Sequence, residues 1–204
     1  MKQVSLIFIL LIGFSCILSA QTVTIGSQVW MSKNLNVTNF RNGNPIPQAK
    51  TNKEWEKAME ERKPAWCYYD NDPKNGAKYG KLYNWYAVND PRGLAPAGWH
   101  IPADAELIAL SEFLGKDSGG KMKSTSGWGE NGNGTNSTGF IGLPGGFRDF
   151  DGSFNSIGRS GFWWSASESG TSSAYFGGLF HDRYDLYRYF YSKGIGMSVR
   201  CLRD

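Results

Sequence analysis

The sequence predicts an α+β fold, in which two to three helices pack on short, mostly antiparallel strands joined by long glycine-rich loops. Helix signals are confined to the part of the chain before Gly115, whereas short apolar runs dominate the part after it. The chain also contains 26 glycines, many of them in polar segments between the apolar runs. Helices that come early and strands that come late are typical of an α+β rather than an α/β protein.

The first 20 residues have the pattern of a secretory signal peptide. Lys2 supplies a positive charge, residues 4–18 are almost wholly apolar, and Ala20 precedes a polar residue. We therefore expect cleavage after Ala20 and an exported protein, either secreted or at the cell surface. The apolar run is shorter than the roughly 18 to 20 residues that span a bilayer, so no transmembrane segment is expected. A lipoprotein signal with lipid on Cys16 is the alternative, and Phe14 fits that pattern poorly.

Three segments carry helix signals. Thr51 followed by Glu54 forms a capping box, which predicts a helix from Lys53 to about Arg62. Apolar residues at near-helical spacing predict another helix over Asp104 to Leu114. The segment from Lys81 to Val88 is interpreted as a third helix.

Short strands are expected on both sides of these helices. Residues 22–30 alternate in polarity around Gly26-Ser27, which predicts two strands joined by a turn. Further strands are expected at residues 66–69, 140–148, 162–167, 174–179 and 196–202.

Five unusual motifs occur in a fixed order along the chain. They are Gly80–Val88, Gly98–Pro102, Leu143–Asp149, Gly161–Ser167 and Ser198–Cys201. In these motifs the chain resembles the Fibrobacter succinogenes major paralogous domain from about Gly26 to Asp204. With the signal peptide assigned to residues 1–20, residues 21–204 are expected to form one domain of this family, and the resemblance implies export by a bacterium. That family in turn resembles the C-type lectin-like fold, in the variant of formylglycine-generating enzymes and of the variable proteins of diversity-generating retroelements.

Composition and charge narrow the classes of partner. The formal net charge is +4 and the chain has no run of Lys and Arg that could follow a phosphate backbone, so nucleic acid is not an expected partner. Aromatic residues are plentiful, with 8 Trp, 10 Tyr and 12 Phe. Most of them must form the core, and the others are available for a binding surface.

The residue pattern does not favour catalysis, and we expect no catalytic residues. His100 lies at a helix entrance, where a structural hydrogen-bonding role is expected. Nothing places Ser165 on a nucleophile elbow. Carboxylates such as Asp149 are glycosidase candidates only by residue type, and Cys67 with Cys201 does not match the active-site pair of formylglycine-generating enzymes. An uncharacterised hydrolase is therefore only the second alternative function.

No cofactor is required by the sequence, and calcium is the one candidate. Asp70, Asp72 and Asn75 supply hard oxygen ligands within one loop. Their spacing is not that of an EF-hand, and Asp and Asn also occur in turns for conformational reasons. Both interpretations stay open at this point.

Cys67 and Cys201 remain after signal cleavage. In an oxidising compartment they could form a disulfide. Two buried free thiols are the alternative, and neither cysteine has the spacing of a zinc site.

The C-terminal half alternates aromatic and charged side chains, which suits a binding surface for sugars or proteins. In the retroelement variable proteins the ligand surface lies on strands near the C-terminus, so the resemblance implies a binding face over residues 148–188. The candidate ligand-binding residues are Asp149, Asp151, Arg159, His181, Asp182, Arg183, Tyr184, Tyr187 and Arg188. A strand over 182–188 would place Arg183 and Tyr187 on one face. The competing interpretation is that aromatics such as Trp164 are core.

The sequence thus predicts a non-catalytic recognition module that binds carbohydrate or another surface macromolecule. The first alternative is a structural domain that assembles with other exported proteins.

Overall fold

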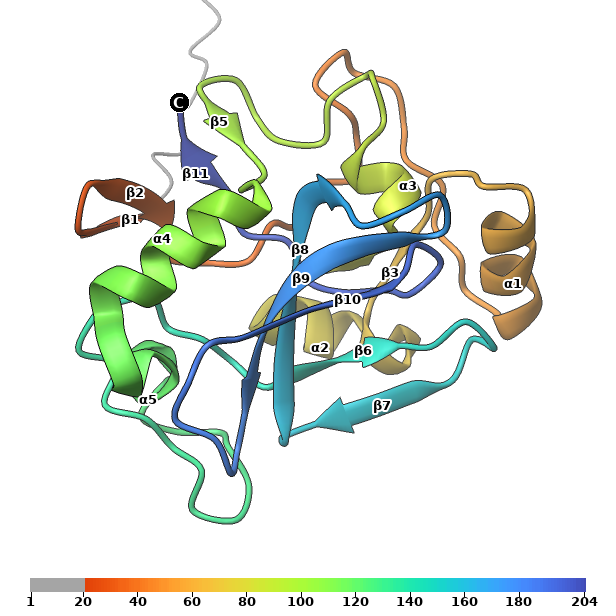
Figure 1. Cartoon of the computed structure of the whole chain (residues 1–204). Helices are drawn as coiled ribbons and strands as arrows, with labels where there is room; N and C mark the ends of the chain where they lie inside the picture. The colour runs from red at the N-terminus through yellow and green to blue at the C-terminus, as the bar shows by residue number, and fades with distance from the viewer. Residues whose placement is uncertain (1–20) are drawn as a thin grey trace, which may run out of the picture.

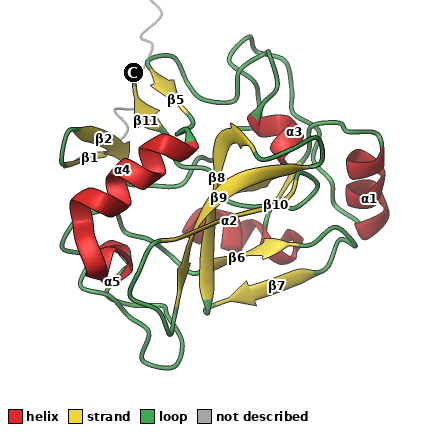
Figure 2. Ribbon diagram, in the orientation of Figure 1, coloured by secondary structure: helices red, strands yellow, loops and turns green. Residues whose placement is uncertain are grey.

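The computed structural model describes residues 21–204, so the predicted signal peptide and Cys16 lie outside the described residues. Within the described part the fold is α+β, as the sequence predicts, with helices arranged around the strands and long loops between them (Figure 2). None of the helices in residues 21–204 has the length and apolar character that a bilayer-spanning segment requires.

A four-stranded sheet brings together distant parts of the chain (Figure 1). β1 (Thr22–Ile25) and β2 (Gln28–Met31) form the predicted hairpin. Gly26 in its turn has a φ of 60°, a left-handed conformation that glycine adopts without steric cost. β11 (Leu202–Arg203) pairs with β2 on one side and with β5 (Trp99–His100) on the other. The first and last described strands therefore lie in the same sheet.

The second sheet has five strands in the order β10-β9-β8-β6-β7. They are β6 (Gly145–Arg148), β7 (Phe154–Ile157), β8 (Ser160–Glu168), β9 (Ser173–Phe180) and β10 (Tyr187–Ser192). All neighbours are antiparallel except β6 and β8, which are parallel. β10 is an edge strand and lies at the front in Figure 1.

Two predicted helices are confirmed. α1 (Asn52–Glu60) begins at the predicted capping box, in which the Thr51 hydroxyl accepts from the Glu54 N–H and the Glu54 carboxylate accepts from the Thr51 N–H. α4 (Asp104–Leu114) has the predicted bounds and buries Leu107, Leu110 and Leu114. A further short helix, α5 (Ser118–Met122), follows α4.

The helix predicted over Lys81–Val88 is wrong in its first half. β4 (Leu82–Tyr83) pairs there with β3 (Trp66–Cys67), and α3 covers only Trp85–Val88. Tertiary contacts explain why the helix is shorter than predicted. The pairing with β3 holds Leu82 and Tyr83 in a strand, and the Asn84 side chain caps α3.

The segment that precedes β4 contains a helix that was not predicted from the sequence. α2 (Pro73–Tyr79) begins where the Asp72 carboxylate accepts a hydrogen bond from the Lys74 N–H, with Pro73 at the first helical position.

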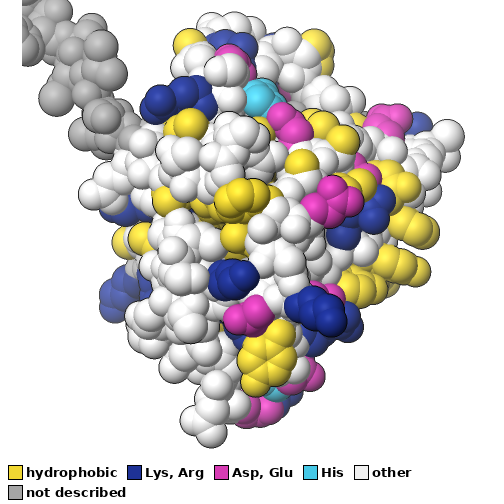
Figure 3. Space-filling view, turned by 60° about the vertical axis from the view of Figure 1, so that its left-hand side comes forward, with side chains coloured by type: hydrophobic (Ala, Val, Ile, Leu, Met, Phe, Trp, Pro, Cys, Tyr) yellow, Lys and Arg dark blue, Asp and Glu magenta, His cyan; other side chains and the backbone are white. Residues whose placement is uncertain are grey.

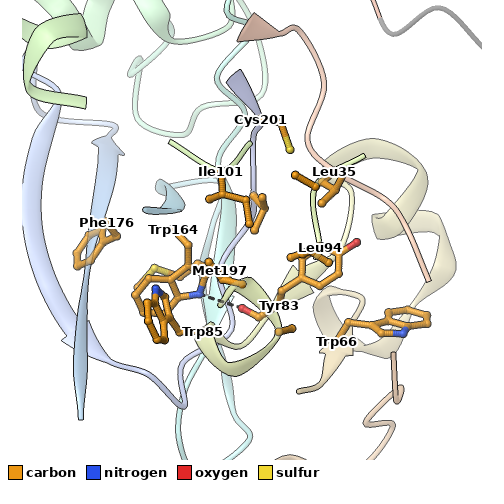
Figure 4. Packing of buried hydrophobic residues seen from close by; sticks show 14 of the residues in the cluster. Leu35, Trp66, Tyr83, Trp85, Leu94, Ile101, Trp164, Phe176, Met197 and Cys201 are labelled. Atoms are coloured by element: carbon orange, nitrogen blue, oxygen red, sulfur yellow. Dashed lines mark hydrogen bonds between the residues drawn. The ribbon is translucent and has the colours of Figure 1, made fainter. Parts of the chain in front are cut away.

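The largest hydrophobic cluster contains Trp164, for which a core role was the competing interpretation (Figure 4). Trp164 is fully buried and its indole donates to the Tyr83 carbonyl over 2.9 Å. The Trp85 indole donates to the Ser165 carbonyl over 2.9 Å. Phe176 and Met197 pack beside them. The indole N–H groups of Trp164 and Trp85 thus both have a partner, which avoids the cost of an unpaired buried donor.

Four buried cations lack a carboxylate partner among the described residues: Lys81, Lys123, Arg148 and Arg200, each at most 2% exposed. Backbone carbonyls, side-chain amides and aromatic rings surround them instead. Such groups can hold a buried cation because they supply acceptors and π faces without a full negative charge.

A disulfide between Cys67 and Cys201 was one of two open alternatives, and both cysteines are buried free thiols in the fold. Cys67 packs with Trp55 and Leu82 in one hydrophobic cluster, whereas Cys201 belongs to the cluster around Trp164. The fold holds the two thiols in separate cores, so the alternative of two buried thiols is the one observed. Burial raises the pKa of each thiol to about 12.

Candidate functional site

One face of the five-stranded sheet is covered by aromatic rings. Register places Tyr189 opposite Phe176, Tyr187 opposite Gly178 and Tyr191 opposite Ala174. Edge-to-face contacts continue the set across the sheet, with centroid distances of 5.5–5.6 Å. We call this set the aromatic face; it comprises Phe147, Phe162, Phe176, Phe180, Tyr187, Tyr189 and Tyr191.

The aromatic face contains a hollow and an exposed rim. Phe147, Phe162, Phe176, Tyr191 and Met197 line a cavity of about 160 Å³. On β10, Tyr189 and Tyr191 of this face are 48% and 45% exposed, and Phe190, which pairs with Tyr175 and lies on the opposite side of the strand, is 42% exposed. Hydrophobic side chains gather along the right-hand edge of the space-filling view, next to charged groups (Figure 3). Large exposed apolar groups that cluster on one surface indicate an interaction site.

A glycine permits this packing at the centre of the sheet. A Cβ on Gly178 would lie 3.1 Å from the Phe162 ring and 3.3 Å from the Phe180 ring. Because Gly178 has no side chain, the Phe162 and Phe180 rings can approach each other over it. The Tyr187 ring then packs on Phe180 at 5.6 Å, which fixes the start of β10.

The opposite side of β10 ties the strand to α4. Arg188 pairs with Asp104 through two hydrogen bonds, of which the one from Nη2 to Oδ2 measures 2.9 Å. The guanidinium also lies 5.1 Å from the Tyr175 ring. Hydrogen bonding to Asp104 raises the pKa of Arg188. Arg188, a predicted ligand-binding residue, therefore already has a partner and points away from the aromatic face.

The remaining predicted ligand-binding residues do not form one site. Asp149 and Asp151 lie in the turn between β6 and β7, where the Asp151 carboxylate accepts from the Ser153 N–H. Arg159 lies at the other end of β7 and pairs with Glu130. His181 Nδ1 is 3.6 Å from Oε2 of Glu130, so Glu130 joins these two residues. No sequence pattern pointed to Glu130, because it lies in the glycine-rich loop, far from Arg159 and His181 in the chain.

The strand predicted over residues 182–188 begins only at Tyr187, because other groups hold the preceding backbone. The buried Lys123 ammonium donates to the carbonyls of Phe180 and Arg183. The Ser118 hydroxyl accepts from the Leu186 N–H. Because these backbone groups bond to side chains, they do not pair with a neighbouring strand, and residues 181–186 form a loop.

The loop carries the other predicted binding residues. Arg183 forms a two-bond pair with Asp185, at 3.0 Å for each bond. Asp182 is exposed, and Tyr184 is 72% exposed. Of the predicted set, Tyr187 alone lies on the aromatic face. Tyrosine recurs at every second position from Tyr187 to Tyr191. This pattern was the sequence signal that could have extended the predicted site along β10.

The predicted calcium ligands have structural contacts of their own. Asp72 caps α2, and the Asn75 amide donates to the Tyr69 carbonyl over 3.0 Å. Asp70 is exposed and has a φ of 53°. Across residues 21–204, no three His, Cys, Asp or Glu side chains are grouped so that they could hold a metal. A set with an asparagine falls outside that criterion, so calcium binding by these three residues stays a prediction.

Ser165 and His100 lie in structural settings. Ser165 is fully buried, and its hydroxyl accepts from the Ser167 N–H. His100 has both ring nitrogens within hydrogen-bonding distance of carboxylates, those of Asp204 and Glu106. These contacts agree with the hydrogen-bonding role expected for His100.

The helices, the two larger sheets and the aromatic face together define an α+β protein with an exposed aromatic sheet face. The chain belongs to the Fibrobacter succinogenes major domain family, whose model matches residues 23–203. This match confirms the family resemblance drawn from the five sequence motifs. Comparison with curated proteins gave no significant match, and neither did comparison with solved structures.

Proposed function

We propose that this protein is an exported, non-catalytic recognition module that binds carbohydrate through the aromatic face. The observation that carries the proposal is the exposure of Tyr189 and Tyr191 beside an apolar hollow. They lie two residues apart on one strand, so their side chains share a face. Sugar rings stack on exposed aromatic rings, and the tyrosine hydroxyls supply hydrogen bonds that orient them.

The rim of the aromatic face is ordered before any ligand binds. Tyr189 stacks on Tyr187 at a centroid distance of 5.8 Å and on Phe190 at 4.7 Å. The pairing of β10 with β9 and the ion pair of Arg188 with Asp104 hold the strand from two sides. Pre-ordered side chains lose less conformational entropy on binding, which favours affinity for a flexible ligand such as a glycan.

We also infer that the fold is the C-type lectin-like variant to which the family resemblance leads. Its support is the combination of α1 and α4, the glycine-rich segment 123–144 with little regular structure, and the Trp163-Trp164-Ser165 sequence within β8. Fold alone does not define function, so the recognition role is argued from the aromatic face.

A glycan array tests the proposal, with the doubly substituted Tyr189→Ala/Tyr191→Ala protein beside the unsubstituted one. We expect reproducible glycan binding that the double variant loses. Tyr184→Ala is the matched control, because Tyr184 is more exposed but lies on the loop that precedes β10. Retention of binding by the double variant would place the site elsewhere. Repeating the array with calcium and with a chelator tests the predicted ligands Asp70, Asp72 and Asn75.

The edge position of β10 favours a second candidate function, assembly with other exported proteins. Among the described strands, β10 pairs only with β9, and a free strand edge can add a strand from another chain. Light scattering over a range of concentrations, alone and with co-exported proteins, distinguishes the two functions. A folded protein that binds no glycan but forms larger complexes would favour assembly.

A further inference from the structure

A second cavity lies on the other side of β8 from the aromatic face. Phe162 points into the aromatic hollow, whereas its neighbour Trp163 donates its indole N–H to Oδ1 of Asn34 over 2.8 Å. Asn34 lines a cavity of about 340 Å³. Successive residues of a strand point to opposite faces, so the two cavities are separate. We call the second cavity the basic pocket; its walls include Lys33, Asn34, Lys78, Ile141, Leu143 and Arg200.

The basic pocket carries an excess of positive charge. Lys33, Lys78 and Arg200 line it, and no acidic residue is among the residues that do. None of the three forms an ion pair within residues 21–204. The Lys78 ammonium instead lies 4.8 Å from the centre of the Tyr79 ring. A concave surface lined by charges of one sign concentrates ligands of the opposite sign.

Arg200 forms the buried part of the pocket and is 1% exposed. Its Nε and Nη2 donate to Oδ1 of Asn34 over 3.1 and 2.5 Å, and its Nη1 donates to the Phe140 carbonyl. These acceptors are all neutral, so the buried guanidinium has no counter-charge. Burial lowers the pKa of Arg200 to about 9. An anion in the pocket would offset the cost of burying this charge.

The wall of the pocket also contains a strained residue. Ile141 has a φ of 55°, a left-handed conformation that is rare for a β-branched residue. Oδ1 of Asn136 accepts from the Ile141 N–H over 2.7 Å and holds this conformation. Backbone strain of this kind clusters at ligand sites. It is independent of the charge pattern and indicates the same pocket.

We propose that the basic pocket binds a small molecule through an oxyanion group, namely a carboxylate, a phosphate or a sulfate. The Lys33 and Lys78 ammonium groups contact the anion at the mouth, and the Arg200 guanidinium faces it from within. The volume falls within the range of roughly 300–1,000 Å³ that is typical of small-molecule sites, so the ligand is larger than a bare ion.

Isothermal titration tests the proposal at constant ionic strength, with inorganic phosphate, sulfate, acetate and glucuronate as probes. Methyl glucoside serves as the neutral control. We expect at least one of the anions to bind saturably and the neutral sugar not to bind in this pocket. Comparison of the four anions then identifies which oxyanion the pocket prefers.

Two double variants show whether binding occurs in the basic pocket. Lys33→Ala/Lys78→Ala should weaken anion binding by about tenfold or more, because charge-assisted hydrogen bonds are strong. Lys53→Ala/Lys74→Ala is the control: it removes the same charge from exposed positions outside the pocket. Absence of saturable binding by all four anions would overturn the proposal, as would equal weakening in both double variants. Tyr189→Ala/Tyr191→Ala should bind the anion normally, which separates this site from the proposed glycan surface.

Discussion

His100 Nδ1 lies 2.9 Å from Oδ1 of Asp204, and this contact joins β5 to the residue that follows β11. The other ring nitrogen, Nε2, is 3.0 Å from Oε1 of Glu106 in α4. Burial is the largest single effect on the pKa of His100 and lowers it. The hydrogen bonds and charges of Asp204 and Glu106 together outweigh burial, so the pKa is raised above its ordinary value of 6.5. Protonated His100 is thus held between two carboxylates.

This geometry predicts a pH-dependent contribution to stability. A raised pKa in the folded protein means that the contribution is fully present below the unfolded-state pKa of about 6.5 and is lost as pH rises through the folded-state pKa. His100→Gln should therefore lower the free energy of unfolding more at pH 5.5 than at pH 8.5. Urea denaturation of both proteins at the two pH values measures this difference. An equal effect at both values would contradict the prediction.

The buried Arg148 predicts that arginine and lysine are not interchangeable at this position. Its Nε donates to the Gly152 carbonyl over 3.0 Å and its Nη1 to the Ala49 carbonyl over 2.9 Å. The guanidinium carbon also lies over two aromatic rings, 4.8 Å from the centre of Trp55 and 4.7 Å from that of Phe154. A lysine ammonium cannot reproduce this planar set of contacts.

Arg148→Lys should lower the free energy of unfolding by about 1–3 kcal/mol, the cost of leaving buried acceptors unpaired. Chemical denaturation measures the change. The exposed Arg159→Lys serves as the comparison and should stay within about 0.5 kcal/mol of the unsubstituted protein. If the two substitutions lower the free energy of unfolding by similar amounts, then the buried hydrogen bonds of Arg148 do not stabilise the fold.

The sequence predicted local features of this fold better than tertiary ones. The helix that begins after Thr51 was predicted because its cap lies within four residues of sequence. The first half of the helix predicted from Lys81 was wrong because Leu82 pairs with Cys67, a contact that local periodicity does not encode. Likewise, Lys123 holds the loop before β10 from 57 to 60 residues away along the chain.

The two proposed binding surfaces differ in the same way: one could be anticipated from the sequence and the other could not. The concentration of aromatic residues in the C-terminal half was visible in the sequence, but it did not show that Tyr189 and Tyr191 would be the exposed residues of the aromatic face. The basic pocket was not visible, because Asn34 and Arg200 are 166 residues apart and meet only in the fold. Isolated lysines at positions 33 and 78 have no pattern that would identify them as part of one cavity.

The buried thiols predict slow cysteine chemistry. With pKa values raised to about 12 by burial, Cys67 and Cys201 form almost no thiolate near pH 8. Iodoacetamide should leave both unmodified in the folded protein and modify both after denaturation without a reductant. Peptide mass spectrometry measures modification at each position. Rapid modification in the folded protein would contradict the burial, and protection after denaturation would reveal a disulfide.

The left-handed conformation of Ile141 predicts that replacing this residue with asparagine will cost little stability. A left-handed residue costs roughly 1–2 kcal/mol more for a side chain such as isoleucine than for asparagine, which visits that conformation readily. Ile141 is also 38% exposed, so its replacement loses little buried apolar area. Ile141→Asn should therefore leave the free energy of unfolding within about 0.5 kcal/mol of its original value.

Ile157→Asn is the matched control for Ile141→Asn. Ile157 is half-buried at the end of β7, packs against the hydrophobic cluster that contains Tyr69, and is not among the residues with a positive φ. Its replacement removes apolar contacts without relieving strain, and should cost about 1–3 kcal/mol. Urea denaturation of the two variants measures the difference. If Ile141→Asn destabilises the protein as much as Ile157→Asn does, then the left-handed conformation of Ile141 stores no strain.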